Sequence, residues 1–324
     1  MIKFGFIGAG AIGSLFGGYL ANIKEKEIDI SLFCSHDHAI AIKNHGLKIK
    51  SENGIITLKN LNIYDRTNKN LFIKNLDFDY LILTTKTYDT KGAINQYLDI
   101  IEKSKWFIIL QNGLRNEELI NPYVNKDKIM RIVTSHGAIL TQPGHVTHTG
   151  KGFTYIGFPY LRSVETERDL SRDTLLSLER LNFLLNLAGF NSKIELDIST
   201  KVWQKAIVNI GINAIGALTH LNNGKIINNK GLRELMEEVV IEAFEVGRKM
   251  NISLSKDDCI SLTYSVANKT YNNKNSMLQD ILKGKRTEID YLNGKIVDLA
   301  KKLGIKVAVN EVLTNLIKGL ESGL

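Results

Sequence analysis

The amino-acid sequence predicts an α/β protein, with an N-terminal Rossmann-type doubly wound sheet and a second, all-helical C-terminal domain. Short apolar runs alternate with helix-like stretches through residues 1–197, as a parallel sheet with helical crossovers requires. From Ser199 onward the strand signals disappear and long helical patterns replace them. We therefore predict one domain over residues 1–197 and another over residues 198–324.

The composition indicates a globular protein and excludes several other classes. Of the 324 residues 44% are apolar and 23% charged, which is ordinary for a folded chain with sizeable cores. Cys34 and Cys259 are too few for a disulfide framework, and they fit a reducing, cytoplasmic setting. The net charge of +8 comes from scattered lysines and arginines, which favours a solvated surface over nucleic-acid binding.

One uncharged stretch, Phe4–Ala21, could pass for a membrane span or a signal peptide. Six of its eighteen residues are glycine, which makes it a poor hydrophobic anchor. We therefore expect no association with a membrane.

The first expected strand, Ile2–Ile7, leads into a glycine turn and then a helix-like stretch, Ser14–Ile23. In such a unit the first glycine permits the turn, the second lets the backbone approach a pyrophosphate, and the third lets the helix pack on the strand. Free N–H groups at the helix start then attract the phosphates. The sequence therefore predicts a dinucleotide-binding loop made of Gly8, Ala9, Gly10, Ala11, Ile12 and Gly13.

The second expected strand, Ile28–Phe33, is followed by Cys34, Ser35 and His36. A site specific for NAD usually carries Asp or Glu here to bind the ribose 2′-hydroxyl. The absence of that carboxylate leaves room for a 2′-phosphate, and so favours NADP(H), although no arginine stands there either. His36 and His38 form an H-x-H pair that lacks the full set of carboxylate or cysteine ligands of a metal site, so we predict loop residues and no metal site.

Three more strands are expected at Tyr80–Leu83, Trp106–Leu110 and Ile129–Val133, and the first two are followed by polar residues around Lys86 and Asn112. Ligands in doubly wound sheets bind beyond the carboxyl ends of the strands, so these two side chains are placed to meet cofactor and substrate. A plain turn at Asn112 is equally consistent with the pattern.

The rest of the first domain is expected to extend the sheet. Glycines and β-type residues predict a hairpin from His145–Gly150 and Phe153–Gly157. A helix over Leu170–Leu187 and a last short strand over Ser192–Leu196 follow.

The first helix of the second domain carries an unusual polar stripe. Lys205, Asn209 and Asn213 recur every four residues on an otherwise largely apolar helix. Burying an unpaired amide costs about 1–3 kcal/mol, so this stripe predicts a polar cleft wall. A chance polar strip facing solvent is the alternative.

Two later segments each allow a functional and a structural interpretation. Ser276 with Gln279, and Thr287 with Asp290, both have the spacing of a helix capping box. Ser276 would then cap a helix, and Glu288 would occupy a favourable first turn. The pattern alone does not choose between capping and a site.

These pieces together resemble the ketopantoate reductase family (2-dehydropantoate 2-reductase) across nearly the whole chain. The matching residues are Gly8–Gly17, Lys86, Gln111–Gly113, Thr134–Ala138, Gly144–Val146, Trp203–Lys205, Asn209, Asn213, Asn223–Gly224, Ser276–Asp280 and Thr287–Gly294.

The resemblance implies an NADPH-dependent reduction of 2-dehydropantoate to pantoate, a step of pantothenate and coenzyme A biosynthesis, with a small 2-oxo acid as substrate. In such enzymes the lysine matching Lys205 is the general acid, and Glu288 touches the ribose side of the cofactor and orients that lysine. Asn112 would sit between nicotinamide and substrate, Lys86 near the cofactor, and the backbone of Ala138 against the cofactor. The resemblance also implies a set of groups that bind substrate oxygens: Asn209, Asn213, Asn223 and Ser276.

The chain departs from the family at two places. Ser35 stands among the cofactor-binding positions where many relatives carry arginine, and residues 304–310 lack the usual prolines. A related two-domain reductase of another 2-oxo acid is the nearest alternative. A non-catalytic NADP-binding sensor would require the catalytic groups to be missing. The C-terminal helices could form a homodimer interface or equally an intrachain core.

Overall fold

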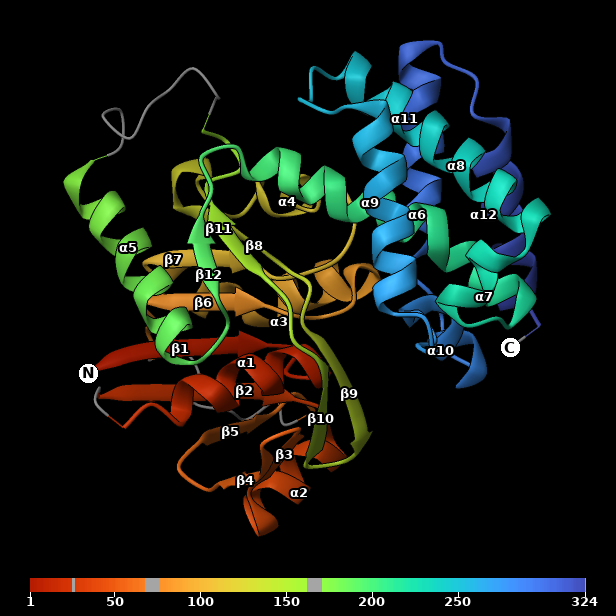
Figure 1. Ribbon diagram of the computed structural model, residues 1–324. Coiled ribbons are helices and arrows are strands. Elements are labelled where there is room, and N and C mark those ends of the chain that lie inside the picture. Colours follow the sequence, from red (N-terminus) through yellow and green to blue (C-terminus); the bar gives the residue numbers. More distant parts are fainter. Residues whose placement is uncertain (25–26, 68–75, 162–170, 324) are drawn as a thin grey trace. The chain divides into compact units, whose positions relative to one another are not determined.

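A computed structural model describes residues 1–24, 27–67, 76–161 and 171–323 of the chain (Figure 1). The chain divides into two compact units. The first comprises residues 1–111 and 115–198, and the second comprises residues 112–114 and 199–324. The division after Ile198 lies next to the predicted domain boundary, whereas the assignment of Asn112–Leu114 to the second unit was not predicted.

The first unit is built on an eight-stranded sheet of order β12-β11-β8-β7-β6-β1-β2-β5. Its strands are β1 (Ile2–Ile7), β2 (Ile28–Cys34), β5 (Asn62–Asp65), β6 (Tyr80–Leu83), β7 (Trp106–Ile109), β8 (Ile129–Thr134), β11 (Thr154–Gly157) and β12 (Ser192–Ile194). Only β11 and β8 pair antiparallel; the other neighbours are parallel. The run β5-β2-β1-β6-β7-β8 has the strand order of a Rossmann sheet, with its switch point between β1 and β6, so the predicted fold class is confirmed.

Helices α1 (Ala11–Ala21), α2 (His36–His45), α3 (Thr90–Lys103), α4 (Glu117–Ile120) and α5 (Arg172–Leu187) belong to this unit. Alternate residues of β1 enter different hydrophobic cores: Phe4 and Phe6 lie in one, and Ile7 lies in the other. Both faces of the sheet are thus buried, which explains the continuous apolar runs in its central strands. Leu170, the expected start of α5, lies outside the described residues.

A second sheet corrects the predicted hairpin. Strands β3 (Leu47–Ser51), β4 (Gly54–Leu58), β9 (Gly137–Gln142) and β10 (His145–Gly150) form it in the order β4-β3-β10-β9. The prediction that His145–Gly150 pairs with Phe153–Gly157 is wrong, because β10 turns back on β9 and β11 pairs with β8. The reason is a tight turn at Pro143 and Gly144, where the glycine adopts a φ of +76°.

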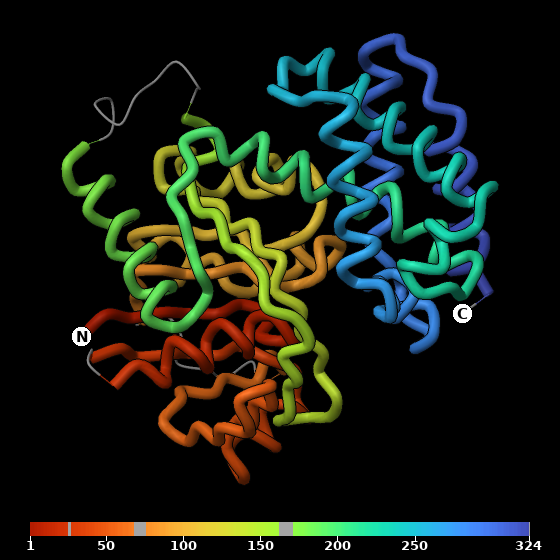
Figure 2. The backbone as a smooth tube through the Cα atoms, in the orientation of Figure 1, coloured from red at the N-terminus to blue at the C-terminus, as the bar shows by residue number. Residues whose placement is uncertain are grey.

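Within the described residues from 199 onward the second unit contains helices and connecting loops and no strand (Figure 2). Its helices are α6 (Ile198–Thr219), α7 (Asn223–Asn228), α8 (Lys230–Lys249), α9 (Lys256–Lys269), α10 (Ser276–Leu282), η5 (Ile289–Tyr291), α11 (Asn293–Leu303) and α12 (Ala308–Glu321). Among all the described helices, none has both the length and the apolar character needed to cross a bilayer.

The start of α12 explains how the chain manages without prolines there. The Glu242 carboxylate, from α8, accepts the backbone N–H groups of Val309 (3.0 Å) and Asn310 (2.9 Å). Asn310 also donates its side-chain amide to the same carboxylate at 2.8 Å. A charged side chain from another helix therefore satisfies the free donors at this helix start.

Candidate functional site

The glycine loop follows β1 in the first unit, and two of its glycines are required by the protein itself. Gly8 has a φ of +80°, and a Cβ built on it would lie 2.3 Å from Cγ2 of Thr85. A Cβ on Gly13 would lie 2.4 Å from Oγ1 of Thr84, because α1 packs closely on the residues that follow β6. The turn and the close helix packing expected of these positions are both present.

Gly10 differs from these two glycines because none of the described residues crowds it. A Cβ at this position would meet only the Gly8 carbonyl oxygen, at 3.8 Å. Gly10 is the N-cap of α1; no described side chain caps this end, and the first turn carries no acidic residue. The open space and the free N–H groups fit the pyrophosphate of a dinucleotide.

His38, a buried histidine on α2, is linked by hydrogen bonds to the glycine loop. The Gly144 N–H donates to Nδ1 of His38 (2.8 Å), so the ring proton of the neutral imidazole lies on Nε2 and is donated to Ser14 Oγ (3.0 Å). The Ser14 hydroxyl then donates to the carbonyl oxygen of Ala9 (3.2 Å). Only 2% of His38 is exposed, and burial lowers its pKa to about 4. His36 and His38 both belong to helix α2, so the expectation of loop residues is wrong for both.

The His38 contact predicts a pH-dependent stability. Unfolded histidine titrates near pH 6.5 and the folded group near 4, so protons bind preferentially to the unfolded state between these values. We expect this group to lower the free energy of unfolding by about 2 kcal/mol on going from pH 7.5 to pH 5. Urea unfolding at both pH values measures the loss, and His38→Gln, which cannot titrate, should show a smaller one. Equal losses in the two proteins would contradict the assignment.

The end of β2 has a cation that sequence reasoning missed. Ser35 is exposed and is the N-cap of α2. Beside it, β2 pairs with β5, and the Arg66 N–H donates to the Cys34 carbonyl oxygen at 2.9 Å. The backbone of Arg66 therefore lies beside Cys34, the last residue of β2. It was overlooked because the short strand β5 has no apolar run to reveal it.

Next to Arg66 the Asp65 carboxylate is fully engaged. Its Oδ2 lies 2.5 Å from Nδ1 of His36, and its Oδ1 accepts from the N–H and the hydroxyl of Thr67 at 2.9 and 2.8 Å. These hydrogen bonds, with that of His36 largest, lower the pKa of Asp65 to about 2, and Asp65 in turn raises the pKa of His36.

Two further cofactor candidates also lie in the first unit. Lys86 is half-buried and directly precedes the short helix η2 (Thr87–Asp89). Ala138 is half-buried on β9, where it pairs with His148. Ala138 therefore belongs to the second sheet rather than to an extension of the first.

Three predicted residues converge within the second unit. The Lys205 ammonium donates to Oδ1 of Asn112 at 2.8 Å, and Nδ2 of Asn112 lies 3.5 Å from Oε2 of Glu288. The Leu114 N–H donates to the Tyr291 carbonyl oxygen (3.1 Å), which ties this segment to η5. Asn112 is therefore more than a turn residue, because its amide connects an ammonium group with a carboxylate.

The rest of the polar stripe on α6 is also withdrawn from solvent. Lys205 and Asn209 are half-buried and Asn213 is 4% exposed, so the alternative of a strip facing solvent is wrong. On α7, Asn223 is 6% exposed and donates to Thr270 Oγ1 at 2.8 Å. Its Oδ1 is buried and has no hydrogen-bond partner among the described residues, so it can accept a bond from a ligand.

The capping interpretation of Ser276 is also wrong. Asn275 is the N-cap of α10 and accepts from the Leu278 N–H at 2.9 Å, whereas Ser276 is the first helical residue and is exposed. Nδ2 of Asn275 lies 3.4 Å from the Ile212 carbonyl oxygen, which fixes this helix start against α6. The Ser276 hydroxyl is therefore not needed as the helix cap.

Thr287 and Asp290 do not form the capping box that their spacing allows, because the Thr287 N–H has a different acceptor. The Thr287 N–H donates to Glu321 (2.6 Å) rather than to Asp290, and the Thr287 hydroxyl accepts from the Ile289 N–H (3.2 Å). Glu288 is 6% exposed. A buried carboxylate that hydrogen-bonds to Asn112 is not a surface charge at a helix start.

Among the described residues no group of three or more His, Cys, Asp or Glu side chains is arranged to hold a metal ion. Cys34 and Cys259 are buried free thiols, and burial raises their pKa values to about 12 and about 11. At neutral pH both remain protonated and unreactive.

Comparison with known proteins relates both units to one family. Residues 4–159 match the family Ketopantoate reductase PanE/ApbA, and residues 197–321 match Ketopantoate reductase PanE/ApbA C terminal. A 2-dehydropantoate 2-reductase of Pyrococcus horikoshii is 36% identical over 329 residues, covering 99% of this chain and 98% of the relative. One of Archaeoglobus fulgidus is 33% identical and covers 98% and 97%.

Solved structures show the same fold over the whole length. D-mandelate dehydrogenase in its ternary structure with NADH and anilino(oxo)acetate has a TM-score of 0.89 and 26% identity, covering 99% of both chains. A PanE/ApbA family ketopantoate reductase from Ralstonia eutropha has a TM-score of 0.83 and 26% identity with the same coverage. The family matches and the identity of the relatives lead to one conclusion: the chain belongs to the ketopantoate reductase family.

Proposed function

We propose that the protein catalyses the NADPH-dependent reduction of 2-dehydropantoate to pantoate, with Lys205 as the general acid. The observation that carries this proposal is the hydrogen-bonded chain from Lys205 through Asn112 to Glu288. The names of the relatives support the substrate, and the open glycine loop supports a dinucleotide.

A bound nicotinamide would supply the hydride for this reduction. The chain's own task is then to bind the keto acid and to protonate its oxygen as negative charge develops there. Asn112 orients the Lys205 ammonium by accepting a hydrogen bond from it, and this ammonium is the group that would donate a proton to the substrate oxygen. Glu288 lies against the Asn112 amide and thereby helps to orient it.

The remaining amides and hydroxyl would fix the substrate so that its ketone faces the acid. Asn209 and Asn213 follow Lys205 along α6, and Asn223 offers a buried amide oxygen with no described hydrogen-bond partner. Ser276 starts a helix that Asn275 anchors to α6.

The direct test is the oxidation of NADPH by the purified protein with 2-dehydropantoate, followed by absorbance beside 2-oxoisovalerate, pyruvate and a control without substrate. We expect rapid turnover with 2-dehydropantoate and little with the other acids. Faster turnover of another 2-oxo acid would favour a reductase of that acid, an alternative that the structural likeness to D-mandelate dehydrogenase motivates. Binding of NADPH without any turnover would favour the sensor, although the chain carries Lys205, Asn112 and Glu288 in mutual contact.

For the cofactor we propose a preference for NADPH, with Arg66 serving the 2′-phosphate in place of the arginine absent at Ser35. The supporting observations are the hydrogen bond that places Arg66 at the end of β2 and the engaged carboxylate of Asp65. A cation next to free helix N–H groups suits a phosphate. The carboxylate is not available to bind a ribose diol.

The cofactor preference predicts a selective effect of Arg66→Ala. We expect kcat/KM for NADPH to fall roughly 10- to 100-fold, since a charge-assisted contact is lost, with little change for NADH. Steady-state kinetics with both cofactors measures this, and Arg66→Lys should retain part of the preference. A wild-type protein that prefers NADH, or equal losses for both cofactors, would contradict the assignment.

The place in pantothenate and coenzyme A biosynthesis, the cytoplasmic location and a homodimer stay predictions.

A further inference from the structure

A glutamine side chain connects the segments that follow β6 and β7. Nε2 of Gln111 lies 2.9 Å from the Thr85 carbonyl oxygen and 3.0 Å from the hydroxyl oxygens of Thr85 and Thr90. Gln111 is 8% exposed and Thr90 is fully buried. One amide group therefore binds residues on both sides of Lys86, and Gln111 itself immediately precedes Asn112.

A buried asparagine closes the same network. Nδ2 of Asn116 lies 3.3 Å from Oγ1 of Thr87 and 3.5 Å from Oε1 of Gln111. Asn116 and Thr87 are each only 1% exposed. The two loops that carry Lys86 and Asn112 are thus joined by side chains that solvent does not reach.

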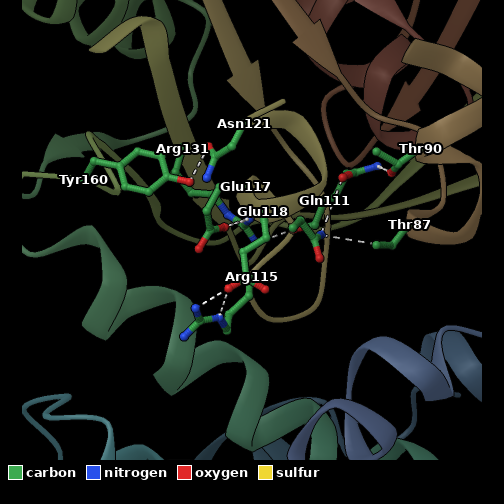
Figure 3. Close-up of polar contacts among 10 residues, drawn as sticks. Thr87, Thr90, Gln111, Arg115, Glu117, Glu118, Asn121, Arg131 and Tyr160 are labelled. Atoms are coloured by element: carbon green, nitrogen blue, oxygen red, sulfur yellow. Dashed lines mark hydrogen bonds and ion pairs between the residues drawn. The ribbon is translucent and has the colours of Figure 1, made fainter. Parts of the chain in front are cut away.

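A buried arginine holds the backbone of the Gln111 loop. Arg131, on β8, is 1% exposed and donates from Nη2 to the Gln111 carbonyl oxygen at 3.3 Å and from Nη1 to Glu117 at 3.1 Å. Figure 3 shows Arg131, Glu117 and Gln111 drawn together beside the loop. The Gln111 carbonyl and the Asn112 N–H belong to the same planar peptide group, so Arg131 fixes the peptide that leads into Asn112.

Burying the polar groups of Gln111, Asn116 and Arg131 costs desolvation free energy, so core packing alone does not explain why these residues stand here. Buried ion pairs seldom stabilise a fold more than apolar side chains of similar volume would. Buried side chains that are linked by several hydrogen bonds do, however, favour one arrangement of the backbone that carries them. The arrangement defined here is that of the two loops bearing Lys86 and Asn112.

We propose that Gln111, Asn116 and Arg131 are positioning residues: they hold the loops of Lys86 and Asn112 in the geometry that cofactor binding and proton donation require. The proposal rests on the proposed function for the role of the two loops. Gln111 and Asn116 serve both loops, whereas Arg131 serves the Asn112 side alone.

This difference predicts two distinguishable variants. Gln111→Met keeps the volume but removes the amide, so we expect NADPH to bind several-fold more weakly and kcat to fall roughly 10- to 100-fold, as a small misplacement of reacting groups does. Arg131→Lys keeps the charge near Glu117 but does not span both partners. It should lower kcat in the same range and leave the Kd of NADPH within about twofold.

Tyr160→Phe is the matched control. The Tyr160 hydroxyl, which this variant removes, donates to Oδ1 of Asn121 at 2.5 Å in the same region and has no hydrogen bond to Gln111. It should change the melting temperature as the other variants do and leave kcat and NADPH affinity as in the wild type. Fluorescence titration with NADPH and kinetics with the best 2-oxo acid substrate supply the readouts. Folded Gln111→Met and Arg131→Lys proteins with wild-type kcat, or a Tyr160→Phe protein that loses kcat equally, would overturn the proposal.

The titration also separates this proposal from the function. A wild-type protein that turns over another 2-oxo acid but not 2-dehydropantoate refutes the proposed substrate only. A Gln111→Met protein that binds NADPH as tightly as the wild type refutes the positioning role at Lys86, whatever the substrate is.

Discussion

Replacement of Lys205 by alanine is expected to lower kcat by roughly 10²–10⁴-fold, because the variant loses the ammonium that protonates the ketone oxygen. The NADPH affinity should stay within about twofold, since the glycine loop belongs to the other unit. Single-turnover kinetics and a cofactor titration measure the two quantities separately.

The matched control for this variant is Lys249→Ala, which removes an exposed ammonium near the end of α8. It should leave kcat unchanged. A primary amine added to Lys205→Ala should restore part of the activity if proton donation is what was lost. Wild-type turnover in Lys205→Ala would exclude the general-acid role.

The second large effect is expected at Gly10. Gly10→Val should weaken NADPH binding by roughly 10²-fold or more, since two methyl groups would occupy the space where a pyrophosphate approaches. The protein itself should tolerate the change, because among the described residues a Cβ there meets only the Gly8 carbonyl oxygen, at 3.8 Å. Binding is measured by titration, and stability by thermal unfolding.

Gly92→Val provides the control, because Gly92 lies exposed on α3 and a Cβ there meets no atom of the described part of the chain within 4 Å. This variant should bind NADPH normally. An unchanged NADPH affinity of Gly10→Val would refute the assignment of the glycine loop to the phosphates.

The sequence predicted the central strands of the main sheet and missed most of the smaller one, for a physical reason. Tyr80–Leu83 and Trp106–Ile109 are buried at every position, so each appears as an unbroken apolar run. Gly54–Leu58 of the smaller sheet has no buried residue, and Asn62–Asp65, the edge strand of the main sheet, is partly polar and was missed as well. Strands of this kind are defined by the neighbours that pair with them, and their own composition does not reveal them.

The candidate site was predictable where local spacing or topology governs it. The four-residue spacing of Lys205, Asn209 and Asn213 placed them on one helical face, and the rule for strand ends selected Asn112. The contact of Asn112 with Lys205 spans 93 positions of sequence and follows from tertiary packing. Arg66 was missed for the same reason, because only its pairing beside Cys34 gives it a role.

The assignment of Asn112–Leu114 to the second unit affects how hybrid enzymes of this family should be designed. A chimaera joined near residue 198 takes Lys205 and Glu288 from one parent and Asn112 from the other. The activity of such a hybrid depends on whether Asn112 of one parent can still hydrogen-bond to Lys205 of the other. It therefore does not report only on whether the two domains are interchangeable. Grafting residues 112–114 together with the C-terminal part would keep the hydrogen-bonded chain within one parent.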